Sequence, residues 1–227
     1  MVDRRSLLLS CGASLFVMPI SNSATAATVG HDARIARIRK GTPPSSLRPP
    51  GRQVLTFLGY SGAGYQNLAA ALAEAASVLA AHDPARTTVN IGATADGIGA
   101  VYRLARSRGF ATMGIVSSLA LESGATWAAE VDRIYVVEDT TWGGAGADGL
   151  LSPTSAAMVA VSDEMVAIGG GAIARDELMA ARREGKRCRF IPAESNHEIA
   201  RQKARSAGKP VPASFDSVLG TTAWASP

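Results

Sequence analysis

The chain has 227 residues, 47% of them hydrophobic and 19% charged, so it is long and apolar enough to bury the core of one sizeable globular domain. Aromatic residues make up only 5%, which argues against an aromatic β-sandwich and favours closely packed helices around a sheet. The net charge is +4, and many basic residues gather within 34–52 and 182–189 without interleaved aromatic side chains. This pattern favours solvated surfaces, and we expect no nucleic-acid partner.

The first 27 residues have the pattern of a secretory signal peptide. Arg4 and Arg5 precede a mostly apolar run over 6–20, and small residues at 21–27 supply a cleavage site. The apolar run is too short and too interrupted for a membrane span. The sequence therefore predicts export to the periplasm or the medium, with no membrane association after cleavage. The arginine pair resembles a twin-arginine signal, and a buried N-terminal helix is the alternative.

Cysteine and histidine usage predicts neither a disulfide framework nor a metal site. Signal cleavage would remove Cys11 and leave Cys188 alone. The three histidines, His31, His82 and His197, lack the spacing of metal ligands. We expect no metal and no cofactor.

The segment 28–52 is predicted to be a flexible, basic, Pro-rich leader. It holds four prolines and shows neither a helical nor a strand period. A single domain is predicted to span 53–227.

Apolar strands and amphipathic helices alternate through this domain. Strands are predicted at 54–60, 87–93, 111–118, 132–140, 165–168 and 187–193. Helices are predicted at 66–82, from a cap at Asp96 through 108, and at 152–161, 172–184 and 195–206. The strands are nearly continuous apolar runs, as expected when both faces of a sheet are covered. The sequence thus predicts an α/β, three-layer Rossmann-like fold with a mostly parallel sheet and helices on both faces.

Ligands of such sheets bind beyond the carboxyl ends of the strands, which gathers four loops into one crevice. The candidate ligand-binding residues on these loops are Ser61, Gly62, Thr94, Asp96, Gly97, Ser117, Ser118, Gly169, Gly170, Gly171 and Arg175. Two alternatives stay open: Asp96 can simply cap a helix, and Ser117 and Ser118 can cap the next one.

The glycine turn at 169–171 is the strongest single signal. It lies between an apolar strand and a helix, where glycines allow a sharp turn and free N–H groups attract an anion. The turn predicts a phosphate or nucleotide site. The SGAG loop after the first strand lacks the GxGxxG spacing of a dinucleotide dehydrogenase, because position 67 is Asn67, and the glycine-rich loop at 142–150 contains no GK[ST] of a phosphate loop.

Two further residues carry alternative interpretations. Glu177 follows the glycine turn and is the candidate catalytic acid or base, although an acidic residue near a helix N-terminus is favoured by the helix dipole alone. Trp142 lies in a glycine-rich loop and can either stack on a base or pack in the core.

Two stretches resemble the SLOG superfamily, which includes the Lonely-guy phosphoribohydrolases, often labelled lysine-decarboxylase-like. The stretch 89–118 resembles the second strand, helix and third strand of that superfamily. The stretch 158–177, MVAVSDEMVAIGGGAIARDE, is similar to its Ser-Asp, strand and PGGxGTxxE signature. The resemblance covers about 53–193, and it implies a Rossmann-like nucleotide-binding fold and often a homodimer.

The chain departs from this signature where the family's hydrolases carry their chemistry. Glu177 keeps the final acidic position, but Ile173 replaces a glycine and Ala174 a threonine. Thr154 and Ser155 stand in place of an Arg-Lys pair. These changes weaken the expected phosphate site, and Arg175 is the candidate that would compensate.

The leading functional hypothesis is an exported SLOG-like protein that binds a nucleotide, a sugar phosphate or a related phosphorylated small molecule, with altered or lost catalysis. The alternatives are a hydrolase of the N-glycosidic bond of a nucleotide or nucleoside that uses Glu177, and a structural or interaction protein without a ligand.

Overall fold

The computed structural model describes residues 32–39 and 41–221. The predicted signal peptide at 1–27 lies outside the described residues. The chain divides into a unit of residues 1–31 and a second unit from Asp32 onward, and the description below concerns the second.

Seven strands of the described residues form one sheet in which every neighbouring pair is parallel. The strands are β1 (Ile35–Ile38), β2 (Gln53–Gly59), β3 (Thr87–Ile91), β4 (Ala111–Ser117), β5 (Arg133–Val137), β6 (Glu164–Ile168) and β7 (Arg187–Ile191). Their order across the sheet is β1-β5-β4-β3-β2-β6-β7.

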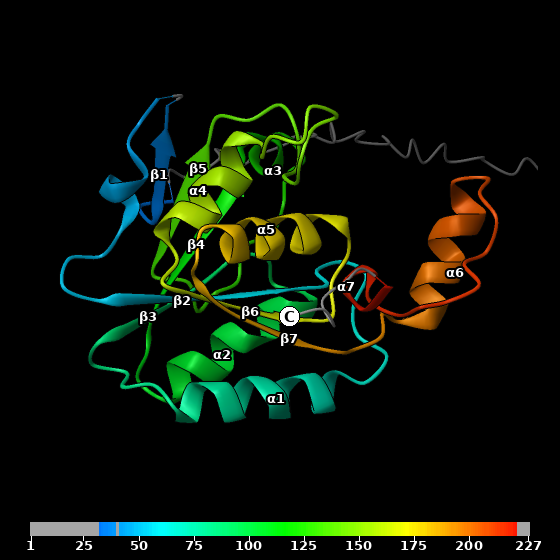
Figure 1. Ribbon diagram of the computed structural model, residues 1–227, viewed down its shortest axis with the longest axis horizontal. Helices are drawn as coiled ribbons and strands as arrows, with labels where there is room; N and C mark the ends of the chain where they lie inside the picture. Colours follow the sequence, from blue (N-terminus) through cyan, green and yellow to red (C-terminus); the bar gives the residue numbers. More distant parts are fainter. Residues whose placement is uncertain (1–31, 40, 222–227) are drawn as a thin grey trace, which may run out of the picture. The chain divides into compact units, whose positions relative to one another are not determined.

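Helices cover both faces of this sheet (Figure 1). The helices are α1 (Leu68–Ala80), α2 (Ala100–Ser107), α3 (Ser118–Glu122), α4 (Pro153–Val161), α5 (Ala172–Arg183), α6 (His197–Ser206) and α7 (Val218–Thr221), with 3-10 turns η1 (Pro44–Leu47) and η2 (Gly97–Gly99). Alternate residues of β2 serve the two sides: Leu55 and Phe57 pack with α1 and α2, whereas Val54 and Leu58 pack with α4 and α5. The predicted three-layer, Rossmann-like α/β fold is therefore confirmed. None of the helices in the described part of the chain is long and apolar enough to cross a membrane.

The segment before Gln53 is more ordered than the sequence predicts. Ile35–Ile38 pairs along β5 as the edge strand β1, and Leu47 is only 1% exposed beneath α4. Arg48 forms an ion pair with Asp163 at 2.7 Å. The expectation that 28–52 contains no strand is wrong for these residues. A four-residue edge strand with one neighbour is too short to show a strand period in the sequence.

The order of the strands indicates where a ligand of this sheet would bind. The chain runs from β2 outward through β3, β4 and β5, and then returns to place β6 on the other side of β2. The direction of progression therefore reverses between β2 and β6. In open parallel sheets ligands bind in the crevice beyond the strand ends at such a reversal.

Candidate functional site

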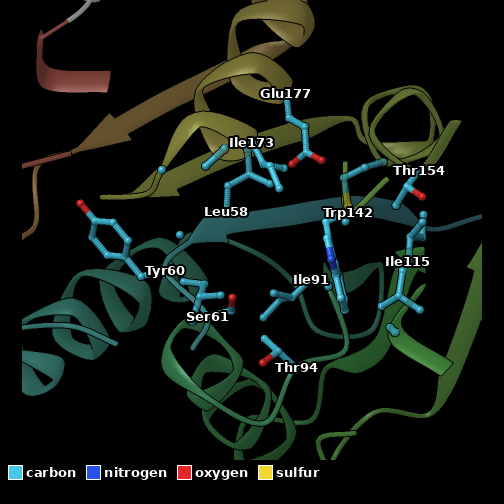
Figure 2. Close-up of a pocket in the computed structure, with 18 of the residues that line it drawn as sticks. Leu58, Tyr60, Ser61, Ile91, Thr94, Ile115, Trp142, Thr154, Ile173 and Glu177 are labelled. Carbon is cyan, nitrogen blue, oxygen red and sulfur yellow. The ribbon is translucent and has the colours of Figure 1, made fainter. Parts of the chain in front are cut away.

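A cavity of about 660 Å³ opens at this reversal, beyond the carboxyl ends of β2, β3 and β4 and against the N-terminus of α5 (Figure 2). Its apolar walls include Leu58, Ile91, Ile98, Ile115, Val116, Trp127, Trp142, Met158 and Ile173. Its polar lining residues are Tyr60, Ser61, Thr94, Thr126, Thr154 and Glu177. The size and the mixture of apolar walls with a few polar groups are typical of a small-molecule site.

The structure brings four of the predicted site residues to this cavity: Ser61, Thr94, Gly171 and Glu177. The others lie outside its lining: Gly62, Asp96, Gly97, Ser117, Ser118, Gly169, Gly170 and Arg175.

Two of the three glycines in the turn are packed against protein. Gly169 has φ +59°, and a Cβ there would lie 2.7 Å from Tyr60 Cε2 and 2.8 Å from the carbonyl oxygen of Ala193. Gly170 has φ +115°, and its added Cβ would lie 2.6 Å from Ala174 Cβ. At Gly171 no atom lies within 4 Å of an added Cβ, so only the third glycine offers its backbone to a ligand.

Gly171 is also the N-cap residue of α5, and no side chain caps that helix. The first N–H groups of a helix have no partner within it, and they carry the positive end of the helix dipole. Gly171, Ala172, Ile173 and Ala174 all line the cavity. The uncapped end of α5 is thus available to an acceptor group of a ligand.

The two serines after β4 hold a neighbouring loop. The hydroxyl groups of Ser117 and Ser118 donate to the carbonyl oxygen of Asp139, at 3.2 and 2.8 Å. Ser117 also caps α3 by accepting from the N–H of Leu119. The capping alternative therefore agrees with the geometry of Ser117, whereas Ser118 is the first residue of α3 and bonds to Asp139 instead.

Asp96 is exposed at the start of η2 and makes no capping hydrogen bond, contrary to the cap predicted there. Gly97 packs against the backbone instead, because a Cβ there would overlap the carbonyl oxygen of Tyr60. The helix start at this point is specified by a close backbone approach, which a capping pattern does not detect.

Glu177 is the one carboxyl group among the described residues that line the cavity. It is 4% exposed, and its carboxyl group points from α5 towards the space between Ile173 and Trp142 (Figure 2). Burial raises the pKa of Glu177 to about 7; a hydrogen bond from Ser155 opposes this shift, and the negative charge of Asp176 adds to it. At neutral pH the group is therefore divided between its acid and its carboxylate form.

Ser155 connects Glu177 to the loop that carries Trp142. The Ser155 hydroxyl donates to Glu177 Oε1 at 2.6 Å and accepts from the N–H of Gly144 at 2.7 Å. Beside it, Asp176 Oδ2 accepts from the N–H of Ala145 at 3.0 Å. The loop is thus held against α5 by two neighbouring acidic residues.

Asp139 holds the other end of this loop. Its carboxylate accepts from the backbone N–H groups of Thr141 and Thr154. Burial alone would raise the pKa of Asp139, but the hydrogen bonds from Thr154 and Thr141 outweigh it and lower the pKa. Trp142 therefore lies between two anchored points, although its own side chain is 57% exposed.

Thr154 and Ser155 are not among the site residues predicted from the sequence; they stand only where the resembling family has a basic pair. Thr154 is buried, lines the cavity and contributes to the low pKa of Asp139, but its hydroxyl oxygen lacks a hydrogen bond of good geometry within the described residues. The available signal was Ser152-Pro153, which starts α4 at the same edge of the sheet.

Charged side chains that could bind a phosphate are not part of the cavity lining. Within residues 32–39 and 41–221, no Lys, Arg or His lines it. Arg175, the predicted compensating residue, instead forms an ion pair with Asp176 at 2.7 Å. The same part of the chain contains no group of three His, Cys, Asp or Glu residues that could hold a metal ion.

Comparison with known proteins adds little at the level of sequence. No protein-family model matches the chain, and no curated protein matches it. Among solved structures, the Moco carrier protein from Chlamydomonas reinhardtii is similar with 17% identity and a TM-score of 0.44, covering 69% of this chain and 85% of that one. The protein TM1055 is similar with 21% identity and a TM-score of 0.44, covering 60% of this chain and 72% of that one.

Proposed function

We propose that this chain is a divergent SLOG-like protein that binds a small molecule of the nucleotide class, meaning a flat heterocycle attached to a sugar, with or without phosphate. The observation that carries the proposal is the cavity at the reversal of the sheet, lined by Trp142 and by the uncapped start of α5. Sites of this kind bind nucleotides in parallel α/β sheets.

Each part of the ligand has a matching part of the cavity. Trp142, Ile91 and Ile115 form apolar surfaces suited to a flat ring, and an aromatic face favours stacking (Figure 2). The hydroxyl groups of Ser61 and Thr94, at the ends of β2 and β3, suit the hydroxyl groups of a sugar.

A second candidate function is hydrolysis of the N-glycosidic bond, favoured by the position of Glu177 and by its pKa of about 7. An acid with this pKa can give its proton to the leaving base as the C1′–N bond breaks. Water then forms the new bond to C1′ and returns a proton to the carboxylate. Release of free base from nucleosides or their monophosphates, abolished in Glu177→Gln, would establish this activity.

Export and a homodimer remain part of the proposal and rest on the sequence alone. Residues 1–27 carry the signal-peptide pattern, and the resemblance to the superfamily implies the dimer. Mass spectrometry of the intact chain from an expressing cell should give the mass without residues 1–27. Light scattering should give twice the mass of the monomer. A chain that retains Met1, or a monomer, would overturn the respective point.

A thermal-shift panel tests the binding proposal. A ligand at a hundred times its Kd stabilises a fold by about 2.7 kcal/mol. We expect nucleosides or nucleotides to raise the Tm of the wild type by more than that of Trp142→Ala, because the variant loses a stacking surface. Leu150→Ala is the matched control, because Leu150 is exposed on the same loop but lies outside the cavity lining. No shift with any compound of this class would overturn the proposal.

A further inference from the structure

The cavity is acidic where a phosphate site is basic. Among the described residues that line it, Glu177 is the one carboxyl group, and no cationic side chain accompanies it. Asp176 is next to Glu177 in the sequence. The Asp139 carboxylate accepts a hydrogen bond from the N–H of the lining residue Thr154. A phosphomonoester carries about −1.5 to −2 charges at pH 7, so the carboxylate form of Glu177 would repel it.

The uncapped end of α5 is partly covered by an apolar side chain. Ile173 lines the cavity below Glu177 (Figure 2). A methyl group at Gly143 would lie 3.2 Å from Ile173 Cγ2, and one at Gly144 would lie 3.4 Å from Ile173 Cγ1. Ile173, which is 39% exposed, therefore contacts the backbone of the Trp142 loop on one side and occupies part of the space in which a phosphate would need room for its oxygens and their water.

Two cations that adjoin residues of the cavity lining, Arg175 beside Ala174 and Lys203 at Gly62 beside Ser61, already have partners. Arg175 donates twice to Asp176 Oδ1, at 2.9 and 2.7 Å. Lys203 on α6 donates to the carbonyl oxygen of Gly62 at 3.0 Å. Recruiting either one would require breaking an existing hydrogen bond.

The polar groups that remain are uncharged hydroxyls. Ser61, Thr94, Thr126 and Thr154 line the cavity, and the Thr154 hydroxyl lacks a well-formed hydrogen bond in the described structure. Hydroxyl groups both donate and accept, so they suit the hydroxyl groups and ring nitrogens of a neutral ligand. We infer that the cavity selects a nucleoside without phosphate and discriminates against the corresponding nucleotide. This inference rests on the proposed function.

Isothermal titration calorimetry with adenosine, guanosine, cytidine and uridine and with their 5′-monophosphates, at pH 8 and low salt, tests the inference. Repulsion of a doubly charged phosphate by a carboxylate several ångströms away predicts at least about tenfold weaker binding of the monophosphate. Higher salt should reduce this difference in affinity between nucleoside and monophosphate, because salt screens the repulsion.

The double substitution Ile173→Gly with Glu177→Gln should bring the ratio of the monophosphate Kd to the nucleoside Kd towards one. It removes the side chain that covers the end of α5, and it removes the negative charge of Glu177. The control Leu150→Ala should keep the wild-type ratio. Equal or tighter binding of a monophosphate by the wild type would overturn this inference and leave the proposed function standing. Failure of every compound to bind would overturn both.

Discussion

Two glycine-containing segments meet at the cavity, and they contribute to it differently. In the turn at 169–171, Gly169 and Gly170 let the chain pass against Tyr60 and Ala174, and only Gly171 is open. In the loop at 139–151, glycines let the backbone approach Ser155 and Ile173, and this loop presents Trp142 to the cavity.

This difference between the two segments distinguishes a turn that serves packing from a loop that serves binding. The turn that resembles a phosphate cradle in sequence is mostly a packing device, whereas the loop beside it is anchored at Asp139 and Gly144 and supplies a ligand surface. A glycine run therefore predicts a close approach of something to the backbone, but it does not say whether that partner is a ligand or the protein itself.

The largest expected effect is at Gly170. Gly170→Ala places a side chain at φ +115° and 2.6 Å from Ala174 Cβ, so we expect a loss of about 3 kcal/mol in the free energy of unfolding. Gly171→Ala is the matched control and should cost about 1 kcal/mol or less. Urea denaturation measures both. Similar losses at the two positions would erase the distinction drawn within the turn.

The next effect concerns Glu177 and pH. The folded state raises the pKa of this carboxyl group from 4.5 to about 7, so it binds the proton more tightly than the unfolded chain does. The free energy of unfolding should therefore fall as pH rises through this range, by on the order of 3 kcal/mol in total.

Glu177→Gln should remove this decline and make the protein more stable than the wild type at pH 8. The exposed Glu122→Gln is the control and should leave the profile unchanged. Denaturation midpoints between pH 4.5 and 8.5 measure the effect. An unchanged slope in Glu177→Gln would assign the pH dependence to other groups.

The fold was largely predictable because its strands are nearly continuous apolar runs bounded by glycine. The strands β2 to β7 and most helices follow from that alternation, whereas β1 does not, since four residues at an edge leave no period to detect.

The site was predictable only where it follows from the backbone. The rule that ligands bind beyond the strand ends gathers Ser61, Thr94 and Gly171, and these three residues line the cavity. The contact of Ser155 with Glu177 spans 22 positions and depends on how α4 docks on α5, which no local pattern records. The same limit applies to Ser117 and Ser118, whose partner is Asp139.

A smaller effect is expected at Ser155. Ser155→Ala leaves the N–H of Gly144 and one oxygen of Glu177 without their partner, which should cost about 2 kcal/mol. Because the Ser155 hydrogen bond lowers the pKa of Glu177, that pKa should rise further in the variant. Urea denaturation and NMR titration of the carboxyl carbon measure the two effects. Ser107→Ala, at an exposed position, is the control, and a pKa that stays the same would contradict the role of Ser155.

The smallest effect on stability is expected at Trp142. Its side chain is 57% exposed, so Trp142→Ala should change the free energy of unfolding by about 1 kcal/mol or less while weakening ligand binding. Denaturation of the free protein checks the first point. A loss of about 3 kcal/mol in the free energy of unfolding would show that Trp142 is a core residue. The loop would then serve packing, as the turn does.

The position of a bound nucleoside tests the account most directly. A crystal structure of the protein with a nucleoside should show the ring between Trp142 and Ile91, with the sugar near Ser61 and Thr94 at the ends of β2 and β3. Electron density for the nucleoside anywhere other than this cavity, or none at saturating concentration, would contradict the account.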